Sequence, residues 1–344
     1  MAIKLKPQEA PEAPAAASQT ALSKEQLARL EKAGYELVGP HKHSAVKVCH
    51  WCKKAILNGG SCYKNRFYGI ESERCVQFTP ALPFCTQKCV FCWRDPASYS
   101  ARWTGEVDDA KEIAEGAIKA QLHNLNGFPG NTNVNMAVWK RSQQPKHAAI
   151  SLAGEPCLYP QLPVLIKEFH KMEMTTFLVS NGTRPEMFER LADENALPTQ
   201  LYISLAAYDQ FSHEKILLPQ EPGTWKKYED SLETMANLKG KTRAVLRMTL
   251  MKNLNMSDAA VDGFSKLIAL ANPDYVEAKS YMHVGASYMN LEKDEMPTQE
   301  QINEFSQKLA QETGYLVTDE HGPSAVTLLC RDERAQRERI LKKD

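Results

Sequence analysis

Short apolar runs alternate with longer helix-like segments along the chain from residue 76 onward. Seven runs predict strands, at 76–78, 148–152, 176–179, 201–205, 244–249, 275–278 and 325–329. Helix ends are marked too, because Thr298 with Gln301 predicts a capping box and Gly240 and Gly314 follow expected last turns. The strands read as continuous buried runs, which favours a parallel sheet. The pattern therefore predicts an α/β fold, a full or partial (β/α) barrel.

The segment before this barrel has a different pattern. Residues 24–33 predict a short helix, whereas residues 48–84 combine Cys, Lys and Gly with little periodicity. Such a segment needs something other than an apolar core to hold it, and bound metal is one candidate. We expect four parts: a disordered tail (1–23), a Cys-rich N-terminal extension (24–75), the barrel (76–330) and a charged C-terminal end (331–344).

Composition excludes several classes of protein. Of the 344 residues, 43% are hydrophobic and 24% charged, as in an average globular protein. No apolar run is long enough to span a membrane, and the first twenty residues contain no apolar stretch, so we expect a cytosolic protein. With 42 basic and 42 acidic residues the net charge is zero, so a nucleic-acid partner would have to be bound by local patches.

Polar motifs follow several of the predicted strands. Gly154-Glu155-Pro156 follows the second run and Ser180-Asn181-Gly182 the third, and similar motifs occur at 207–209, 252–253 and 280–283. Each motif alone is also ordinary turn chemistry. Chemistry in a (β/α) barrel lies at the carboxyl ends of the strands, so their shared position predicts a site there.

The nine cysteines are crowded, seven of them between Cys49 and Cys92. Without a secretory signal, this crowding indicates metal binding before disulfides. Cys85, Cys89 and Cys92 have C-x3-C-x2-C spacing directly after the first predicted strand. Three thiolates on one short loop can bind a four-iron cube and leave one iron open for substrate. The alternative is a zinc ion completed by a distant Cys or His.

Cys49, Cys62 and Cys75 form a second set, spaced thirteen residues apart each time. They could fold back onto the same mouth of the barrel and hold a second cluster with one open iron. Cys52 complicates this interpretation, because Cys49 and Cys52 also form a C-x2-C pair. From spacing alone, a zinc ribbon and a second cluster are equal alternatives.

The first loop, with Phe91 directly before its last cysteine, resembles the signature loop of radical S-adenosylmethionine (SAM) enzymes. The resemblance implies a partial barrel of the radical SAM type and a 4Fe-4S cluster on Cys85, Cys89 and Cys92. The open iron would chelate SAM, which one electron cleaves to a 5′-deoxyadenosyl radical. It further implies SAM contacts from Phe91, Gly154, Glu155, Ser180, Asn181 and Ser204.

Both cysteine sets together resemble the archaeal tRNA 4-demethylwyosine synthase family of wybutosine biosynthesis, over residues 49–330. Trp93-Arg94-Asp95 and the segments 180–185, 202–205 and 277–279 fit the same pattern. The resemblance implies a second 4Fe-4S cluster on Cys49, Cys62 and Cys75, with Cys52 as a bystander. It implies a radical enzyme that condenses N1-methylguanosine, at position 37 of phenylalanine tRNA, with pyruvate.

In this family a lysine at the place of Lys64 is proposed to form a Schiff base with pyruvate. A desolvated amine beside a positively charged cluster would be nucleophilic. Lys64 could instead be a surface or phosphate-binding lysine, and pyruvate could instead chelate the second cluster. We also expect an external electron donor, a monomer, and tRNA contacts from basic and aromatic groups at 53–54, 64–66, 93–94, 102–103 and 139–141. His41, His43 and His50 are expected to be bystanders.

Three hypotheses therefore remain open from the sequence. The first is the tRNA-modifying radical enzyme with two clusters. The second is a radical SAM enzyme that acts on another substrate and uses the second cysteine set as an electron relay. The third is a zinc or nucleic-acid-binding module, which would leave the polar motifs after the strands unexplained.

Overall fold

The computed structural model describes residues 22–94 and 99–341. Its strands are β1 Glu36–Val38, β2 Ser44–Val46, β3 Cys75–Thr79, β4 His147–Ile150, β5 Thr175–Ser180, β6 Gln200–Leu205, β7 Arg243–Met248, β8 Tyr275–Lys279, β9 Leu316–His321 and β10 Val326–Cys330. Its helices before β6 are α1 Lys24–Lys32, α2 His50–Ile56, α3 Tyr63–Tyr68, α4 Ala110–Leu125, α5 Met136–Ser142, α6 Leu162–Lys171 and α7 Pro185–Asp193. Its later helices are α8 Gln210–Ser212, α9 Thr224–Asn237, α10 Lys252–Asn255, α11 Asp258–Ala271, α12 Gln299–Thr313 and α13 Glu333–Arg337.

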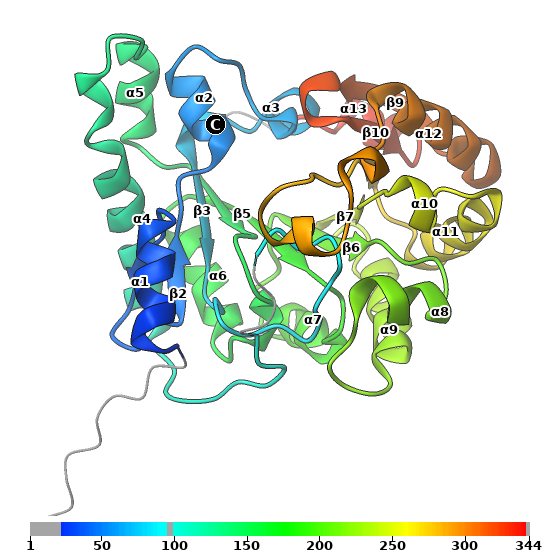
Figure 1. Cartoon of the computed structure of the whole chain (residues 1–344), viewed down its shortest axis with the longest axis horizontal. Coiled ribbons are helices and arrows are strands. Elements are labelled where there is room, and N and C mark those ends of the chain that lie inside the picture. The colour runs from blue at the N-terminus through cyan, green and yellow to red at the C-terminus, as the bar shows by residue number, and fades with distance from the viewer. Residues whose placement is uncertain (1–21, 95–98, 342–344) are drawn as a thin grey trace, which may run out of the picture.

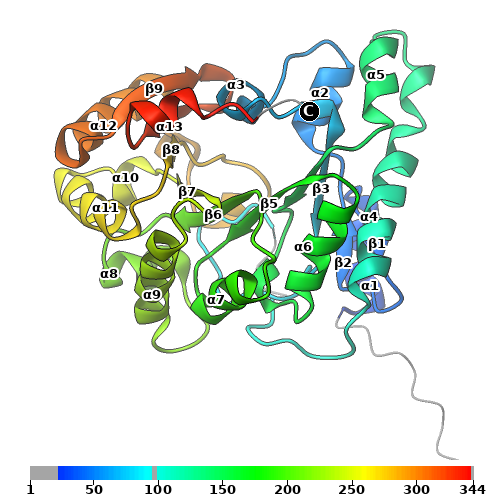
Figure 2. The same ribbon diagram turned by 180° about the vertical axis from the view of Figure 1, so that it is seen from behind.

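All strands belong to one sheet in the order β1-β2-β3-β4-β5-β6-β7-β8-β10-β9. The six strands from β3 to β8 are parallel neighbours in sequence order, which is the arrangement of a (β/α) barrel. Antiparallel strands extend the sheet at both ends. The sheet therefore forms a partial barrel, and the helices that connect its strands lie around the outside (Figures 1 and 2).

Each of the seven predicted strands overlaps an observed one, but the expectation of a wholly parallel sheet is wrong at its end. β10 pairs antiparallel with β8, because β9 and β10 form a hairpin and β10 lies on the inner side of it. The sequence analysis also missed β1, β2 and β9. The first two have three residues each, too few for a periodic pattern, and β9 is a half-exposed edge strand that contains polar residues.

The outer layer forms because each helix buries one apolar face against the strands. Neighbouring helices pack in pairs, α4 with α6, α7 with α9, α9 with α11, and α11 with α12. The predicted ends of α12 are confirmed, since Thr298 and Gln301 form a capping box and Gly314 closes the helix at φ +74°. The largest apolar cluster lies between this layer and the outer face of the sheet.

A second apolar cluster fills the inside of the barrel. Tyr63 and Phe67 of α3 pack there against Phe177 of β5 and Tyr202 of β6. The helix that follows Cys62 thus closes the interior near the beginnings of the strands. Residues 1–21 of the expected tail and 342–344 of the expected C-terminal end lie outside the described residues, and within the described part no helix could span a membrane.

Candidate active site

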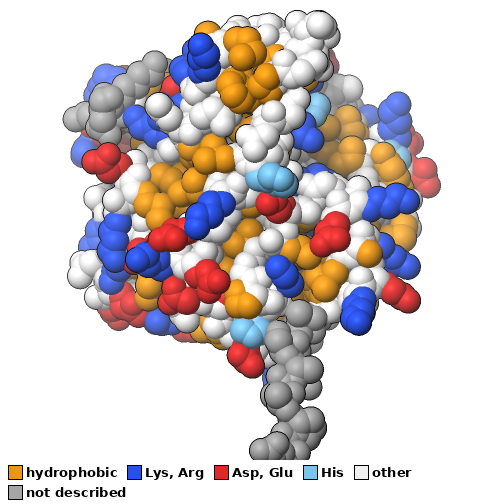
Figure 3. Space-filling view, turned by 90° about the vertical axis from the view of Figure 1, so that its left-hand side faces the viewer, with side chains coloured by type: hydrophobic (Ala, Val, Ile, Leu, Met, Phe, Trp, Pro, Cys, Tyr) orange, Lys and Arg blue, Asp and Glu red, His pale blue; other side chains and the backbone are white. Residues whose placement is uncertain are grey.

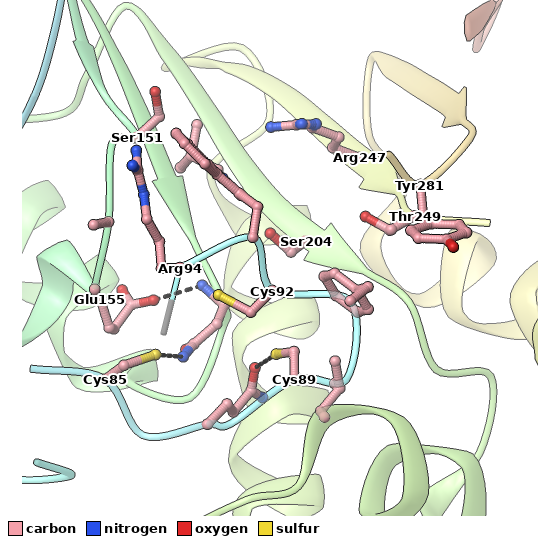
Figure 4. Close-up of a pocket in the computed structure, with 18 of the residues that line it drawn as sticks. Cys85, Cys89, Cys92, Arg94, Ser151, Glu155, Ser204, Arg247, Thr249 and Tyr281 are labelled. Atoms are coloured by element: carbon pink, nitrogen blue, oxygen red, sulfur yellow. Dashed lines mark hydrogen bonds between the residues drawn. The ribbon is translucent and has the colours of Figure 1, made fainter. Parts of the chain in front are cut away.

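The loop that carries Cys85, Cys89 and Cys92 leaves the carboxyl end of β3 and crosses the mouth of the barrel. Backbone hydrogen bonds hold it on both sides: Cys85 N donates to Ser100 O (2.9 Å), and Val90 N donates to Ile216 O (2.9 Å). All three cysteines are half-buried. Figure 4 shows the three thiols close to Glu155, with Ser204, Arg247 and Tyr281 on the neighbouring strand ends. The tether on both sides fixes the loop before any ligand binds.

The three thiols fit a cluster better than a single metal ion. All nine cysteines lie within the described residues and none forms a disulfide. Burial raises the pKa of Cys85 to about 12 and that of Cys89 well above its usual value, and the thiolates of this set raise each other's pKa further. Within residues 22–94 and 99–341, no three ligand side chains converge on one ion. A four-iron cube takes each thiolate on a different iron, and bound iron would displace the thiol protons.

A cavity of about 430 Å³ opens beside this loop. The structure brings six predicted ligand-binding residues together around it, from the cluster loop and the ends of β4, β5 and β6: Phe91, Gly154, Glu155, Ser180, Asn181 and Ser204. Their predicted shared position at the strand ends is therefore correct. The cavity is lined mostly by apolar atoms with a few convergent polar groups, as small-molecule sites are.

Glu155 links the end of β4 to the end of β5. Its buried carboxylate accepts hydrogen bonds from Ser180 Oγ (2.8 Å), Asn181 N (2.7 Å) and Cys157 N (3.0 Å). Burial raises the pKa of Glu155, and these three donors work against that rise. The side chain is thus engaged within the protein, where it aligns the two loops, and it also lines the cavity.

Gly154 and Asn181 join these strand ends to the cluster loop. Gly154 has φ +68°, and a Cβ atom there would lie 1.9 Å from Ala81 O. Only glycine permits this approach. Asn181 Nδ2 donates to Thr86 Oγ1 (2.8 Å) and lies 3.8 Å from Cys85 Sγ. These contacts set the position of the loop relative to the sheet.

The second cysteine set lies at three element boundaries. Cys49 and Cys62 directly precede α2 and α3, and Cys75 begins β3. Their charges are close enough to interact: after burial, a thiolate at Cys49 is the largest cause that raises the pKa of both Cys62 and Cys75. Cys52 is fully buried in an apolar cluster and contacts Glu73 O and Gln121 instead.

Lys64 projects from α3 into the interior of the barrel. Its Nζ lies 4.2 Å from the ring centre of Tyr202 and 5.5 Å from that of Phe177. Burial lowers the pKa of Lys64, while the charge of Glu277 opposes this and that of Arg247 adds to it. Lys64 is thus partly buried, with its amine beside two aromatic rings of the barrel interior.

Sequence reasoning assigned no role to three charged residues of the barrel interior, although it noted segment 277–279 as part of the family pattern. Arg247 of β7 and Lys279 of β8 line the cavity, and Glu277 of β8 is fully buried. Glu277 accepts hydrogen bonds from the hydroxyls of Tyr63 (2.8 Å) and Tyr68 (2.9 Å), which pins both ends of α3 to the sheet. The signal was present, because a charged residue inside a buried apolar run must face an interior polar site.

Several predicted basic groups are already engaged. Arg66 pairs with Asp319 (2.6 Å), Arg102 with Glu221 (3.3 Å) and Arg141 with Glu73 (2.9 Å). His41 and His43 both contact Asp108. On the face formed by α1, α4 and α5, basic and acidic side chains are interspersed rather than gathered by sign (Figure 3).

An open barrel of parallel strands, with three thiols on the loop after its first parallel strand and a cavity at the strand ends, defines a radical SAM enzyme. Residues 79–262 match the family described as "Radical SAM superfamily", and residues 270–331 match "Wyosine base formation". Membership of this superfamily implies a 4Fe-4S cluster and SAM as cofactors.

The similar proteins narrow this class. The S-adenosyl-L-methionine-dependent tRNA 4-demethylwyosine synthase of Pyrococcus abyssi is 44% identical over 312 residues, 90% of each chain. Its counterpart in Pyrococcus horikoshii is 43% identical over 314 residues, 91% of this chain and 90% of that one. The structure of TYW1 with a lysine–pyruvate adduct bound is similar at a TM-score of 0.81 and 34% identity, over 91% of this chain and 98% of that one. The chain belongs to the family of SAM-dependent tRNA 4-demethylwyosine synthases.

Proposed function

We propose that this protein modifies tRNA by condensing N1-methylguanosine, at position 37 of phenylalanine tRNA, with pyruvate to form 4-demethylwyosine. The relatives named for this reaction align with this chain over about nine-tenths of both lengths. One structural observation carries the proposal furthest. Arg247 and Lys279 line the cavity beside the first cysteine set, and their charges also interact with Cys62 of the second set. This supports one chamber shared by both sets.

In this proposal Cys85, Cys89 and Cys92 hold the cluster to which SAM binds. When bound, the cluster and SAM supply a 5′-deoxyadenosyl radical that removes a hydrogen atom from the N-methyl group. Phe91 would hold the adenine of SAM, and Gly154 with Glu155 would hold its methionine end, since all three residues line the cavity. Ser180, Asn181 and Ser204 contact the ribose or carboxylate, because they line the same cavity on adjacent strand ends.

Cys49, Cys62 and Cys75 would hold a second 4Fe-4S cluster. Their mutual effect on pKa supports three thiols within interaction distance, and Cys52 lies within the same range of Cys49 and Cys75. The full burial of Cys52 and its contacts with Glu73 O and Gln121 support leaving it out of the ligand set. Each bound iron would stabilise the thiolate form that burial disfavours. The second cluster would then lie next to Lys64 because Cys62 is two residues away in sequence.

Lys64 would bind pyruvate as an imine. Its neutral amine attacks the keto carbon, a C–N bond forms, and the keto oxygen leaves as water. Desolvation, the largest influence on the pKa of Lys64, lowers that pKa and so favours the neutral amine that this step needs. The similar TYW1 structure with a lysine–pyruvate adduct bound supports this role. Chelation of pyruvate by the second cluster is the alternative, which the trapping experiment below distinguishes.

Anaerobic reconstitution tests the proposal. The purified protein with iron, sulfide, SAM, a reductant such as dithionite, pyruvate and N1-methylguanosine tRNA is expected to produce a tricyclic base, detected by nucleoside mass spectrometry. About eight irons per chain are expected. SAM cleavage without a tricyclic base would assign the chamber to another substrate, and stoichiometric zinc without iron would refute both clusters. The expected electron donor in the cell is a separate protein, and we expect a monomer.

A further inference from the structure

A short segment forms one side of the cavity mouth and takes no part in the function proposed above. We call residues 282–291 the lip. It follows β8 and contains a tight helical turn, Gly285–Met289. In Figure 1 it is the orange loop at the front of the barrel, next to the cyan cluster loop. The lip lies within residues 270–331, the part that matches "Wyosine base formation", and outside the radical SAM match.

The lip is held rigidly against the cluster loop. Ala286 N donates to Trp93 O (3.1 Å), and Asn290 Nδ2 donates to Val90 O (3.3 Å). Gly285 permits this approach, because its φ is +61° and a Cβ atom there would lie 2.2 Å from Trp93 O. A surface fixed in this way loses little conformational entropy when a ligand binds to it.

The lip nevertheless exposes large apolar side chains. Among the described residues twelve large hydrophobic side chains are exposed, and five of them gather here: Trp93 (41%), Met282 (43%), Val284 (39%), Tyr288 (59%) and Met289 (69%). Three of the five, Trp93, Met282 and Val284, also line the cavity. Exposed apolar groups that cluster at the mouth of a site mark an interaction surface.

Two of these rings are already supported from behind. The guanidinium of Arg94 lies 3.0 Å from the ring centre of Trp93 and donates to Leu152 O (2.6 Å). The ring of His283 contacts that of Tyr288 edge-on, with 4.4 Å between the ring centres. Supported aromatic faces of this kind are the platforms on which unstacked bases lie in single-stranded RNA recognition.

The charges around the lip indicate whether it would bind the bases or the phosphates of an RNA. Four charged residues follow it, Glu292, Lys293, Asp294 and Glu295, and their excess of negative charge disfavours phosphates there. Two lysines lie near Trp93, because the charge of Lys53 interacts with that of Lys47. Lys47 Nζ is 5.8 Å from the Trp93 ring centre, and within the described part of the chain neither Lys47 nor Lys53 forms an ion pair with a carboxylate. Bases on the lip and phosphates on the lysine side would satisfy both surfaces.

From this arrangement we infer that the lip and Trp93 form a stacking platform for one unpaired base adjacent to the methylated guanosine. The inference rests on the proposed function, because it needs that guanosine to be turned into the cavity. The neighbouring base then lies at the cavity mouth, on Trp93, Tyr288 and Met289. The platform would hold the RNA backbone open while the flipped base reacts.

Binding of an anticodon stem-loop RNA that carries N1-methylguanosine tests the platform. Tyr288→Ala combined with Met289→Ala is expected to raise the Kd of the reconstituted protein about tenfold, the effect of one lost stacking contact. Both side chains are exposed, so the fold should persist, and iron content verifies this. Met136→Ala, at another exposed methionine, on α5, is the control and should bind like the wild type. Tyr288→Phe keeps the ring and should retain most of the affinity.

A second RNA makes the test specific. An abasic site on one side of the methylated guanosine should raise the Kd of the wild type by the same factor, and the lip variant should lose nothing further. The inference is overturned if the lip variant binds the RNA with the wild-type Kd. It is also overturned if the lip substitutions and an abasic site on either side of the methylated guanosine raise the Kd independently, so that their factors multiply. The lip variant could also bind RNA normally and be reduced by dithionite at the wild-type rate, but be reduced more slowly than the wild type by a flavodoxin-type protein. This result would overturn the inference and assign the lip to the binding of an electron donor. The proposed function is tested separately, by whether the wild-type protein forms the tricyclic base. If it does, the proposed function stands even when the stacking platform is refuted, and if it does not, the proposed function is refuted.

Discussion

Replacing Gly154 by alanine should detach the first cluster from the protein. The added Cβ would lie 1.9 Å from Ala81 O and 2.6 Å from Phe84 O, whereas real Cβ contacts are not found below 3.0 Å. The loop must therefore move by about an ångström, which breaks the hydrogen bond from Glu155 N to Phe84 O (2.6 Å). The left-handed φ costs about 1 kcal/mol, overpacking about 1–3 and the hydrogen bond about 1, in total roughly 3–5 kcal/mol.

Gly240→Ala isolates the cost of the steric clash. Gly240 has a similar φ, +78°, but nothing lies within 4 Å of the Cβ position, so only the conformational penalty of about 1 kcal/mol applies. Gly154→Ala should lose about half of its iron and all SAM cleavage, while Gly240→Ala keeps both. The assays are iron analysis, visible absorbance of the clusters and thermal unfolding under anaerobic conditions. If Gly154→Ala retains its full iron content and unfolds at the same temperature as Gly240→Ala, the close approach of the two loops does not position the cluster.

Three further predictions concern the thiols, the lysine and the dependence of stability on pH. Cys89→Ala should abolish SAM cleavage, whereas Cys62→Ala should leave some uncoupled cleavage without product; a normal product yield from the second variant would remove its cluster from the reaction. Lys64→Ala should abolish borohydride trapping of labelled pyruvate, and labelling equal to that of the wild type would exclude the imine at this residue. Burial lowers the pKa of His147 to about 3, and its ring contacts Thr175 Oγ1 (2.6 Å) and the backbone of Glu71. Because this folded-state pKa lies below the unfolded one, His147 favours folding above about pH 6.5 and this contribution is lost as the pH falls toward 3, by up to about 1.4 kcal/mol per unit. Urea unfolding from pH 7 to 4 should thus show a shallower loss of stability for His147→Gln than for the wild type, and parallel curves would contradict the assignment.

Much of the fold could be predicted because its signals are local. The seven buried runs, the capping box at Thr298 and the closing turn at Gly314 each depend on residues within a few positions of one another. The loop of Cys85, Cys89 and Cys92 is local in the same sense. The short strands β1 and β2 were not predictable, because three residues carry no period and they exist only through pairing with β3.

The candidate site divides in the same way. Glu155 and Asn181 were predicted as members of the site because they follow strands whose ends must meet in a barrel, whereas Phe91 was predicted from the resemblance of its loop to the radical SAM signature. Arg247 and Lys279 were not predicted, since nothing in the residues around them says which interior group they face. The exposed lip was missed too, because exposure is a property of the surface and not of the segment.

By itself the sequence determined the seven long buried strands and which cysteines share a loop, since spacing along the chain controls both, whereas the short strands β1 and β2 depended on tertiary pairing. Only the tertiary structure decided that Lys64 enters the barrel and that the lip lies on Trp93. It also decided that Glu277 accepts hydrogen bonds from the hydroxyls of Tyr63 and Tyr68. Tyr63 and Glu277 are 214 residues apart. Contacts over such separations form only when the sheet curls and closes around α3, and the burial of apolar area over the whole chain drives that step.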